Sequence, residues 1–151
     1  MRTLVATAIL FTAMHASAAT PAYDEAADAK AEIQSTLVQA QRAKVPVLVV
    51  FGANWCGDCK VLDMAFKTGA SAPLVQKSFK VVKVNVGKFD RNVDIAESYG
   101  LPLKNGIPAV VMLSPAGKVM YATRAGELAD ARNMGDTAIY EFFAKVAASK
   151  E

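Results

Sequence analysis

The sequence predicts an α/β domain in which a central mixed sheet is flanked by helices. Two apolar runs rich in β-branched residues, 45–51 and 79–86, are joined by a helical segment. This is the pattern of a right-handed βαβ unit with parallel strands. Two later runs, 109–113 and 118–123, flank a turn and predict an antiparallel hairpin. With the helical segments added, the expected order is α, β, α, β, α, β, β, α.

The first helix is expected over 24–43, because apolar residues recur there at helical spacing. Its apolar face is formed by Ala29, Ile33, Leu37 and Ala40. The run 45–51 is apolar at nearly every position, so this strand should be buried on both faces in the middle of the sheet. A second helix should begin at or near Cys56 and end at about Lys67, and a short helical piece should follow over 74–78.

The strand 79–86 comes next, and Asn92 is expected to cap a helix that ends near Tyr99. After the hairpin, the segment 126–135 has the composition of a loop. Asp136 is then expected to cap the last helix. The apolar residues of that helix are Ile139, Phe142, Phe143 and Val146.

The first 18 residues have the pattern of a cleaved secretory signal. Arg2 precedes an apolar run over 4–14, and Ala16-Ser17-Ala18 fits the small-x-small rule of signal peptidase. The run is well short of the ~20 residues that a membrane-spanning helix needs, so cleavage is favoured over a permanent anchor. The sequence therefore predicts a signal peptide over 1–18, one domain over 19–151, and no membrane span after cleavage.

Charge and composition argue against two classes of function. A formal net charge of +3 over 151 residues is too small to indicate nucleic-acid binding. A structural zinc site needs four ligands, usually cysteine or histidine. The chain has two cysteines, and its one histidine, His15, lies in the predicted signal peptide. We therefore expect neither a nucleic-acid partner nor a metal.

The two cysteines form a Cys56-Gly57-Asp58-Cys59 motif at the start of the second helix. A thiol at a helix N-terminus faces unpaired N–H groups and the positive end of the macrodipole, which lowers its pKa below the ordinary ~8.5. Cys56 is therefore the expected nucleophile. Cys59, one turn later on the same face, is the expected resolving thiol. Gly57, Asp58 and Lys60 form the surroundings of the pair.

Two alternatives without redox chemistry stay open for the cysteines. A purely structural disulfide would close a very short loop and would stabilise the fold little. Two inert buried thiols are the other alternative. A C-x-x-C motif beside a βαβ pattern favours redox chemistry over both. An exported chain with this motif would work in an oxidising compartment.

The motif Trp55-Cys56-x-x-Cys59-Lys60 follows a buried strand, and Gly106-Ile107-Pro108 precedes a later one. With the hairpin and the final helix, this arrangement resembles the thioredoxin superfamily across nearly all of 19–151. The segment 64–86 is most similar to the secreted group that includes the C-terminal domain of DsbD-type thiol reductants and small disulfide-isomerase-like proteins. The resemblance implies a thiol–disulfide oxidoreductase with a Cys56–Cys59 disulfide and no bound cofactor.

The resemblance also implies roles for residues beside the cysteines. It implies a cis peptide at Ile107–Pro108, packed against the two sulfurs, with a backbone edge that pairs with an extended substrate segment. Trp55 would shield the active site. From the residues alone, Pro108 has the alternative of an ordinary proline at a strand entry, and Trp55 that of ordinary packing.

Two positions depart from the thioredoxin pattern. Val50 stands where thioredoxins carry a buried acid, so the usual proton acceptor for the resolving thiol is missing. Lys83 occupies the position that commonly pairs with that acid. Because an unpaired buried ammonium is costly, we expect Lys83 to reach solvent. A direct approach of Lys83 to Cys59 is the alternative. Asp58 replaces a proline, and its negative charge near Cys56 is expected to disfavour the thiolate and give a reducing couple.

The expected function is that of a periplasmic or secreted thiol–disulfide oxidoreductase that reduces or isomerises disulfides of exported proteins. Its partners would be proteins that carry disulfides or dithiols, together with a membrane or periplasmic redox partner that re-reduces it. The alternatives are a disulfide-donating oxidase and a non-catalytic substrate-binding or chaperone module with an inert disulfide.

Overall fold

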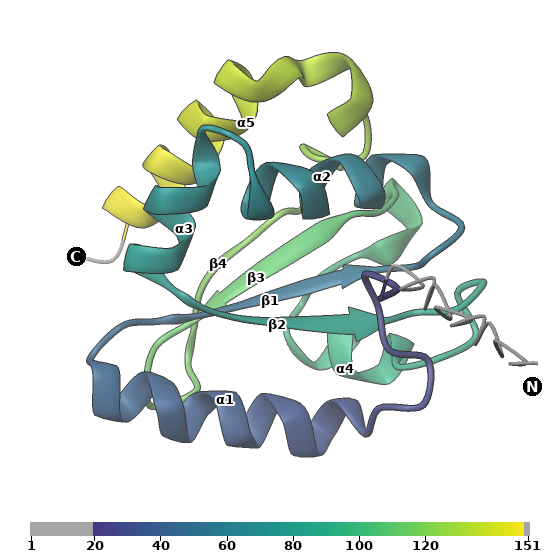
Figure 1. Ribbon diagram of the computed structural model, residues 1–151. Coiled ribbons are helices and arrows are strands. Elements are labelled where there is room, and N and C mark those ends of the chain that lie inside the picture. The colour runs from purple at the N-terminus through teal and green to yellow at the C-terminus, as the bar shows by residue number, and fades with distance from the viewer. Residues whose placement is uncertain (1–19, 150–151) are drawn as a thin grey trace, which may run out of the picture.

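The centre of the molecule is a four-stranded sheet with the strand order β2-β1-β3-β4 (Figure 1). The computed structural model describes residues 20–149, and the predicted signal peptide lies outside the described residues. The strands are β1 (Val47–Gly52), β2 (Lys80–Asn85), β3 (Ala109–Leu113) and β4 (Val119–Ala122).

The strand β1 lies in the middle of the sheet, as its continuous apolar sequence predicts. All 6 of its residues are buried. It pairs in parallel with β2 and antiparallel with β3. The strands β3 and β4 form the expected antiparallel hairpin. The sheet is therefore mixed, and the predicted fold class is confirmed.

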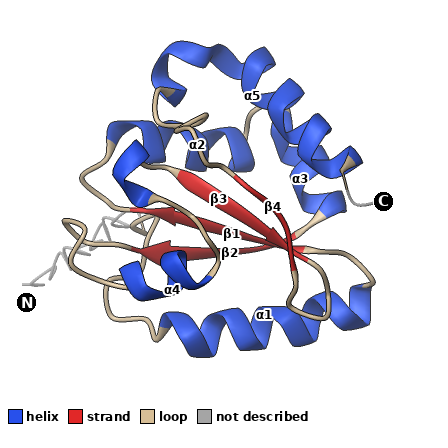
Figure 2. Ribbon diagram, turned by 180° about the vertical axis from the view of Figure 1, so that it is seen from behind, coloured by secondary structure: helices blue, strands red, loops and turns tan. Residues whose placement is uncertain are grey.

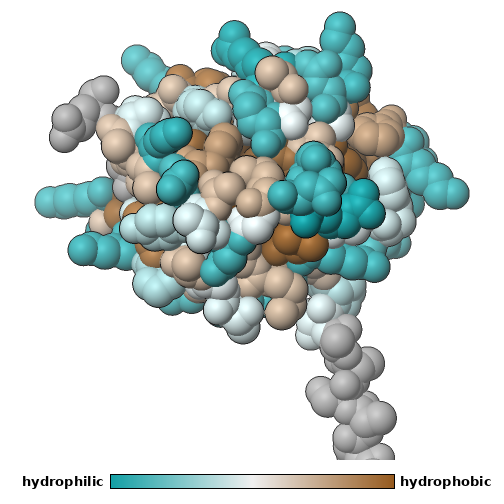
Figure 3. Space-filling model, turned by 90° about the horizontal axis from the view of Figure 1, so that it is seen from above, coloured by the Kyte–Doolittle hydropathy of each residue, from teal (hydrophilic) through white to brown (hydrophobic). Residues whose placement is uncertain are grey.

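Helices cover both faces of the sheet (Figures 1 and 2). One face carries α1 (Ala29–Ala43) and α4 (Val93–Ser98), and the other carries α2 (Gly57–Lys67), α3 (Ser71–Ser78) and α5 (Ala131–Ala148). A short 3-10 helix, η1 (Leu103–Asn105), precedes β3. Seen from the side of α5, hydrophilic side chains alternate with smaller apolar areas (Figure 3).

The alternation of side chains along β1 divides the apolar interior into two cores. Val47, Val49 and Phe51 belong to the core beneath α1 and α4. Leu48 and Val50 belong to the core beneath α2, α3 and α5. Since successive strand residues point to opposite faces, a run that is apolar at every position can support both layers of helices.

The start of the first helix and the capping of α4 differ from the expectation. The first helix begins at Ala29 rather than at residue 24, because the Asp28 side chain caps it by accepting a hydrogen bond from the Ala31 N–H at 3.1 Å. Asn92 occupies the N-cap position of α4, as expected, but its side chain makes no capping hydrogen bond. Its backbone is left-handed, with φ 53°, and its side-chain amide instead donates to the carbonyl oxygen of Asn85 at 2.8 Å.

The last helix also differs from its prediction. It begins at Ala131, inside the predicted loop, and breaks at Gly135, where φ is 75° and ψ is 163°. Asp136 caps a different helix from the one expected. Its carboxylate accepts a hydrogen bond from the N–H of Ala70 at 2.8 Å, at the start of α3, which begins at Ser71 rather than at residue 74. This contact ties α3 to α5.

Candidate active site

The two cysteines lie where β1 gives way to α2. Cys56 is the N-cap of α2, and its Sγ accepts a hydrogen bond from the Cys59 N–H at 3.1 Å. The two sulfurs form a disulfide. Cys59 is fully buried, whereas Cys56 is 4% exposed. The Cys56 sulfur therefore lies at the free N–H groups of a helix start, which stabilise a thiolate.

Gly52, the last residue of β1, has no side chain, and two other side chains therefore approach its backbone closely. The hydroxyl of Tyr23 and the Sγ of Cys59 both lie within 3.0 Å of the point that a Gly52 Cβ would occupy. Tyr23 is buried, and burial raises the pKa of its phenol well above the ordinary 10.0. A neutral phenol thus lies close to the Cys59 sulfur.

The loop before β3 lies against the cysteines. The Sγ of Cys56 is 3.6 Å from the carbonyl oxygen of Ile107, and the Ile107–Pro108 peptide is cis. Gly106 has a φ of 104°, a conformation that favours glycine. The structure therefore brings Ile107 and Pro108 together with the cysteine pair.

Two exposed aromatic rings, one just before Cys56 and one in the turn after β2, contact each other. Trp55 is 55% exposed, and its indole N–H donates to the carbonyl oxygen of Gly87 at 2.7 Å. Its ring meets Phe89 edge to face at 6.1 Å between centroids. Phe89 is 44% exposed and has a φ of 64°, which is uncommon for a bulky residue. Nothing in the local sequence distinguished Phe89 as a neighbour of the active site.

A cavity of about 690 Å³ opens next to Phe89 and reaches the loop that carries Gly106. Apolar side chains form much of its lining, and basic side chains also line it. The lining residues include Val93, Leu101, Leu103, Lys104 and Arg124.

The expectation that Lys83 reaches solvent is wrong. Its ammonium pairs with the carboxylate of Asp63, which also accepts a hydrogen bond from Lys67 at 2.8 Å. Asp63 is 8% exposed, and Lys83 lies 5.9 Å from the centroid of the Tyr23 ring. Burial lowers the pKa of Lys83 below its ordinary 10.5. Val50 itself is packed in the core beneath α2.

Asp58 has a cationic partner that the sequence did not predict. It is 7% exposed, and its Oδ1 accepts hydrogen bonds from the backbone N–H of Arg132 at 2.9 Å and from the Arg132 Nε at 3.1 Å. Sequence reasoning missed Arg132, because 74 positions separate the two residues. Gly57 is partly buried and close to the Arg132 side chain, and Lys60 is exposed.

Within residues 20–149, no group of three or more histidine, cysteine, aspartate or glutamate side chains is arranged to hold a metal ion. None of the helices in this described part of the chain is long and apolar enough to cross a membrane.

A mixed sheet of this order, covered by helices on both faces and carrying a C-x-x-C disulfide at the start of α2, defines the class of thioredoxin-like thiol–disulfide oxidoreductases. The chain belongs to the thioredoxin-like family. A family model described as Thioredoxin-like matches residues 28–115.

Curated relatives are thioredoxins. The chain is 38% identical over 87 residues to a thioredoxin of Pseudomonas aeruginosa, a match that covers 58% of this chain and 71% of that protein. It is 36% identical over 75 residues to the thioredoxin of Porphyra purpurea, covering 50% of this chain and 63% of that protein. The chain thus spans less than two thirds of the Porphyra thioredoxin.

Solved structures are similar over more of the chain. The disulphide isomerase of Xylella fastidiosa Temecula1 superimposes with a TM-score of 0.82 at 48% identity, covering 85% of this chain and 98% of that one. The oxidised C-terminal domain of DsbD from Neisseria meningitidis has a TM-score of 0.52 at 19% identity, and the match covers 79% of this chain and 96% of that one. The second likeness shows the shared fold alone.

Proposed function

We propose that the protein reduces or isomerises disulfides of exported proteins by thiol–disulfide exchange. The observation that carries the proposal is the position of the Cys56 sulfur, which accepts the Cys59 N–H at the start of α2 and lies 3.6 Å from the Ile107 carbonyl. A sulfur in this position has a stabilised thiolate when reduced. It also lies beside a backbone edge with which an extended substrate can pair.

The reaction begins with the protein in its dithiol form. The Cys56 thiolate attacks one sulfur of a substrate disulfide, and the other substrate sulfur leaves as a thiolate. Cys59 then loses its proton and attacks the Cys56 sulfur of the mixed disulfide. The Cys56–Cys59 disulfide forms, the second substrate sulfur leaves and takes up a proton, and two electrons have passed to the substrate. A dithiol partner in the membrane or periplasm then returns two electrons.

Four residues around the cysteines hold the substrate in this proposal. Ile107 and Pro108 form the edge along which the substrate backbone lies. The exposed rings of Trp55 and Phe89 flank that edge and cover apolar parts of the substrate chain. The 48% identity to a protein described as a disulphide isomerase supports the proposed exchange reaction as a whole.

Export is a further part of the proposal. The apolar run over 4–14 and the small residues at 16–18 support a signal peptide that is removed to leave the domain 19–151 in the periplasm or outside the cell. The mass of the protein recovered from a periplasmic extract should place the N-terminus at Ala19. A chain that keeps Met1 and remains in the cytoplasmic fraction would contradict this part.

The activity can be tested with insulin and dithiothreitol. The wild-type protein should accelerate the precipitation of reduced insulin chains, and Cys56→Ser should not, because the attacking thiolate is lost. Binding of reduced insulin without acceleration would favour a chaperone module. Equilibration with glutathione separates the two redox directions, since thioredoxin lies at about −270 mV and the oxidase DsbA at about −120 mV.

A further inference from the structure

The contact between Asp58 and Arg132 joins the active-site motif to the first turn of α5. One oxygen of Asp58 accepts both the backbone N–H and the Nε–H of Arg132, at 2.9 and 3.1 Å. Asp58 stands between the two cysteines in the sequence, yet it is 7% exposed. A carboxylate with so little access to water depends on these donors for its stability.

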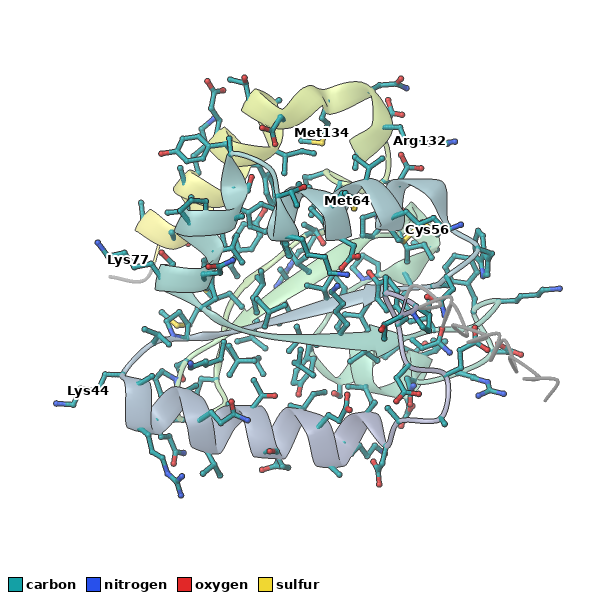
Figure 4. The ribbon with its side chains drawn as sticks, in the orientation of Figure 1. Lys44, Cys56, Met64, Lys77, Arg132 and Met134 are labelled. Carbon is teal, nitrogen blue, oxygen red and sulfur yellow. A yellow bond between two sulfur atoms is a disulfide. The ribbon has the colours of Figure 1, made fainter. Side chains whose placement is uncertain are left out.

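The Arg132 side chain also lies across the start of α2. A Cβ on Gly57 would stand 3.3 Å from both the Cδ and one terminal nitrogen of Arg132. Gly57 is the first residue of α2 and directly follows Cys56. Figure 4 shows Arg132 at the start of α5, above Cys56. The cationic side chain, which is 64% exposed, is therefore a neighbour of both the acid and the cysteine motif.

An unpaired Asp58 would oppose the Cys56 thiolate in two ways. Its negative charge would repel the thiolate. Its oxygens could also accept the free N–H groups in the first turn of α2, which are the groups that stabilise the Cys56 sulfur. Arg132 holds the carboxylate toward α5 and places a positive charge beside it.

We propose that Arg132 is a positioning residue for the redox pair and that it acts through Asp58. The proposal rests on the proposed function in one respect, which is that Cys56 is the attacking thiol. Arg132 keeps the Asp58 carboxylate directed away from Cys56 and offsets its charge. The dithiol form is therefore more stable, and the couple less reducing, than Asp58 alone would make it.

Arg132→Met tests the proposal cleanly. Methionine retains the backbone N–H that binds Asp58 and much of the aliphatic volume, while the guanidinium is lost. In glutathione buffers, the equilibrium constant should shift roughly three- to tenfold toward the disulfide form, the size expected for one charge lost near a partly solvated site. The pH midpoint for alkylation of Cys56 should move to higher pH. Arg132→Gln serves as a second neutral variant.

The double variant with Asp58→Asn shows whether Arg132 acts through Asp58. In the Asp58→Asn background, Arg132→Met should shift the logarithm of the equilibrium constant by less than half as much as in the wild-type background. An equal or larger shift would overturn the proposal, because the guanidinium would then act on Cys56 without the acid. No shift in the wild-type background would overturn it as well.

Arg42→Met is the matched control. It removes the same charge from the last turn of α1, on the opposite face of the sheet, and should leave both readouts unchanged. Neither readout needs a protein substrate. Failure of the insulin assay and failure of the Arg132 proposal are therefore distinguishable.

Discussion

Asp63 is a buried carboxylate on α2, the helix that carries Cys59. It stands four residues after Cys59, so the two side chains share a face of the helix. This spacing was visible in the sequence. The pairing of Asp63 with Lys83 could not be seen in the sequence, because the two residues are 20 positions apart and only tertiary packing brings them together.

Lys83→Met should destabilise the protein far more than Lys67→Met. Both ammonium groups bind Asp63, but the Lys83 side chain is 22% exposed and that of Lys67 is 54% exposed. Loss of Lys83 leaves a nearly buried carboxylate with a weaker partner, at a cost of about 2 kcal/mol in the free energy of unfolding. Loss of the exposed pair should cost about 0.5 kcal/mol. Urea denaturation of the two variants measures the difference, and equal losses would mean that Asp63 does not depend on Lys83.

Gly52→Ala should also destabilise the protein, because the new methyl group would overlap the Tyr23 hydroxyl and crowd the Cys59 sulfur. Both groups are buried and have little freedom to move, so we expect a loss of about 2 kcal/mol. Gly57→Ala is the comparison, since its methyl group would meet only the flexible Arg132 side chain at 3.3 Å. That variant should change the free energy of unfolding by less than about 0.5 kcal/mol. A Gly52→Ala protein as stable as wild type would show that β1 and Tyr23 can separate without cost.

At the scale of elements, α5 shows where local sequence reasoning fails. The glycines at 126 and 135 gave the segment between them the composition of a loop. The structure keeps turns over 126–130, but it places a helical turn from Ala131 and breaks that helix at Gly135. A single turn has little stability of its own. The contact between Asp58 and Arg132 holds this turn against α2, and such a contact has no local signal.

Gly135→Ala should therefore destabilise α5 as a unit. A φ of 75° with a ψ of 163° is accessible almost only to glycine, so we expect a loss of about 1 to 3 kcal/mol. Steric overlap does not contribute to this loss, because no atom of another residue lies within 4 Å of the added Cβ. Thr137→Ala, two residues later in the regular helix, is the control and should leave stability unchanged or slightly higher. An unchanged thermal midpoint for Gly135→Ala would mean that the helix can straighten freely.

At the scale of the whole molecule, the elements that the sequence predicted best are those defined by long patterns. The buried run of β1, the βαβ unit and the hairpin each extend over several residues with one periodicity, and all are present. The contacts that the sequence did not predict join distant positions: Asp58 with Arg132, Asp63 with Lys83, and Trp55 with Phe89. Side-chain pairing of this kind depends on how layers pack, which periodicity does not encode.

The division of roles between the two cysteines should be visible in the protein's complexes with its substrates. Cys56 is slightly exposed at the helix start, and Cys59 is fully buried behind it. A substrate disulfide can therefore meet Cys56 first. Cys59→Ser should accumulate mixed disulfides with exported proteins, because Cys56 still attacks while intramolecular release is blocked. Cys56→Ser should trap little, since the remaining thiol is covered.

Both variants can be expressed with the native signal region, treated with acid to stop exchange, alkylated, and compared on non-reducing gels. Bands that disappear with reductant are mixed disulfides, and mass spectrometry identifies the proteins in them. A Cys56→Ser, Cys59→Ser double variant gives the background. Equal trapping by the two single variants would contradict the assigned roles. If Cys59→Ser traps cytoplasmic proteins alone, the result would support the proposed exchange chemistry but contradict the proposed export, because the chain would then meet its substrates in the cytoplasm.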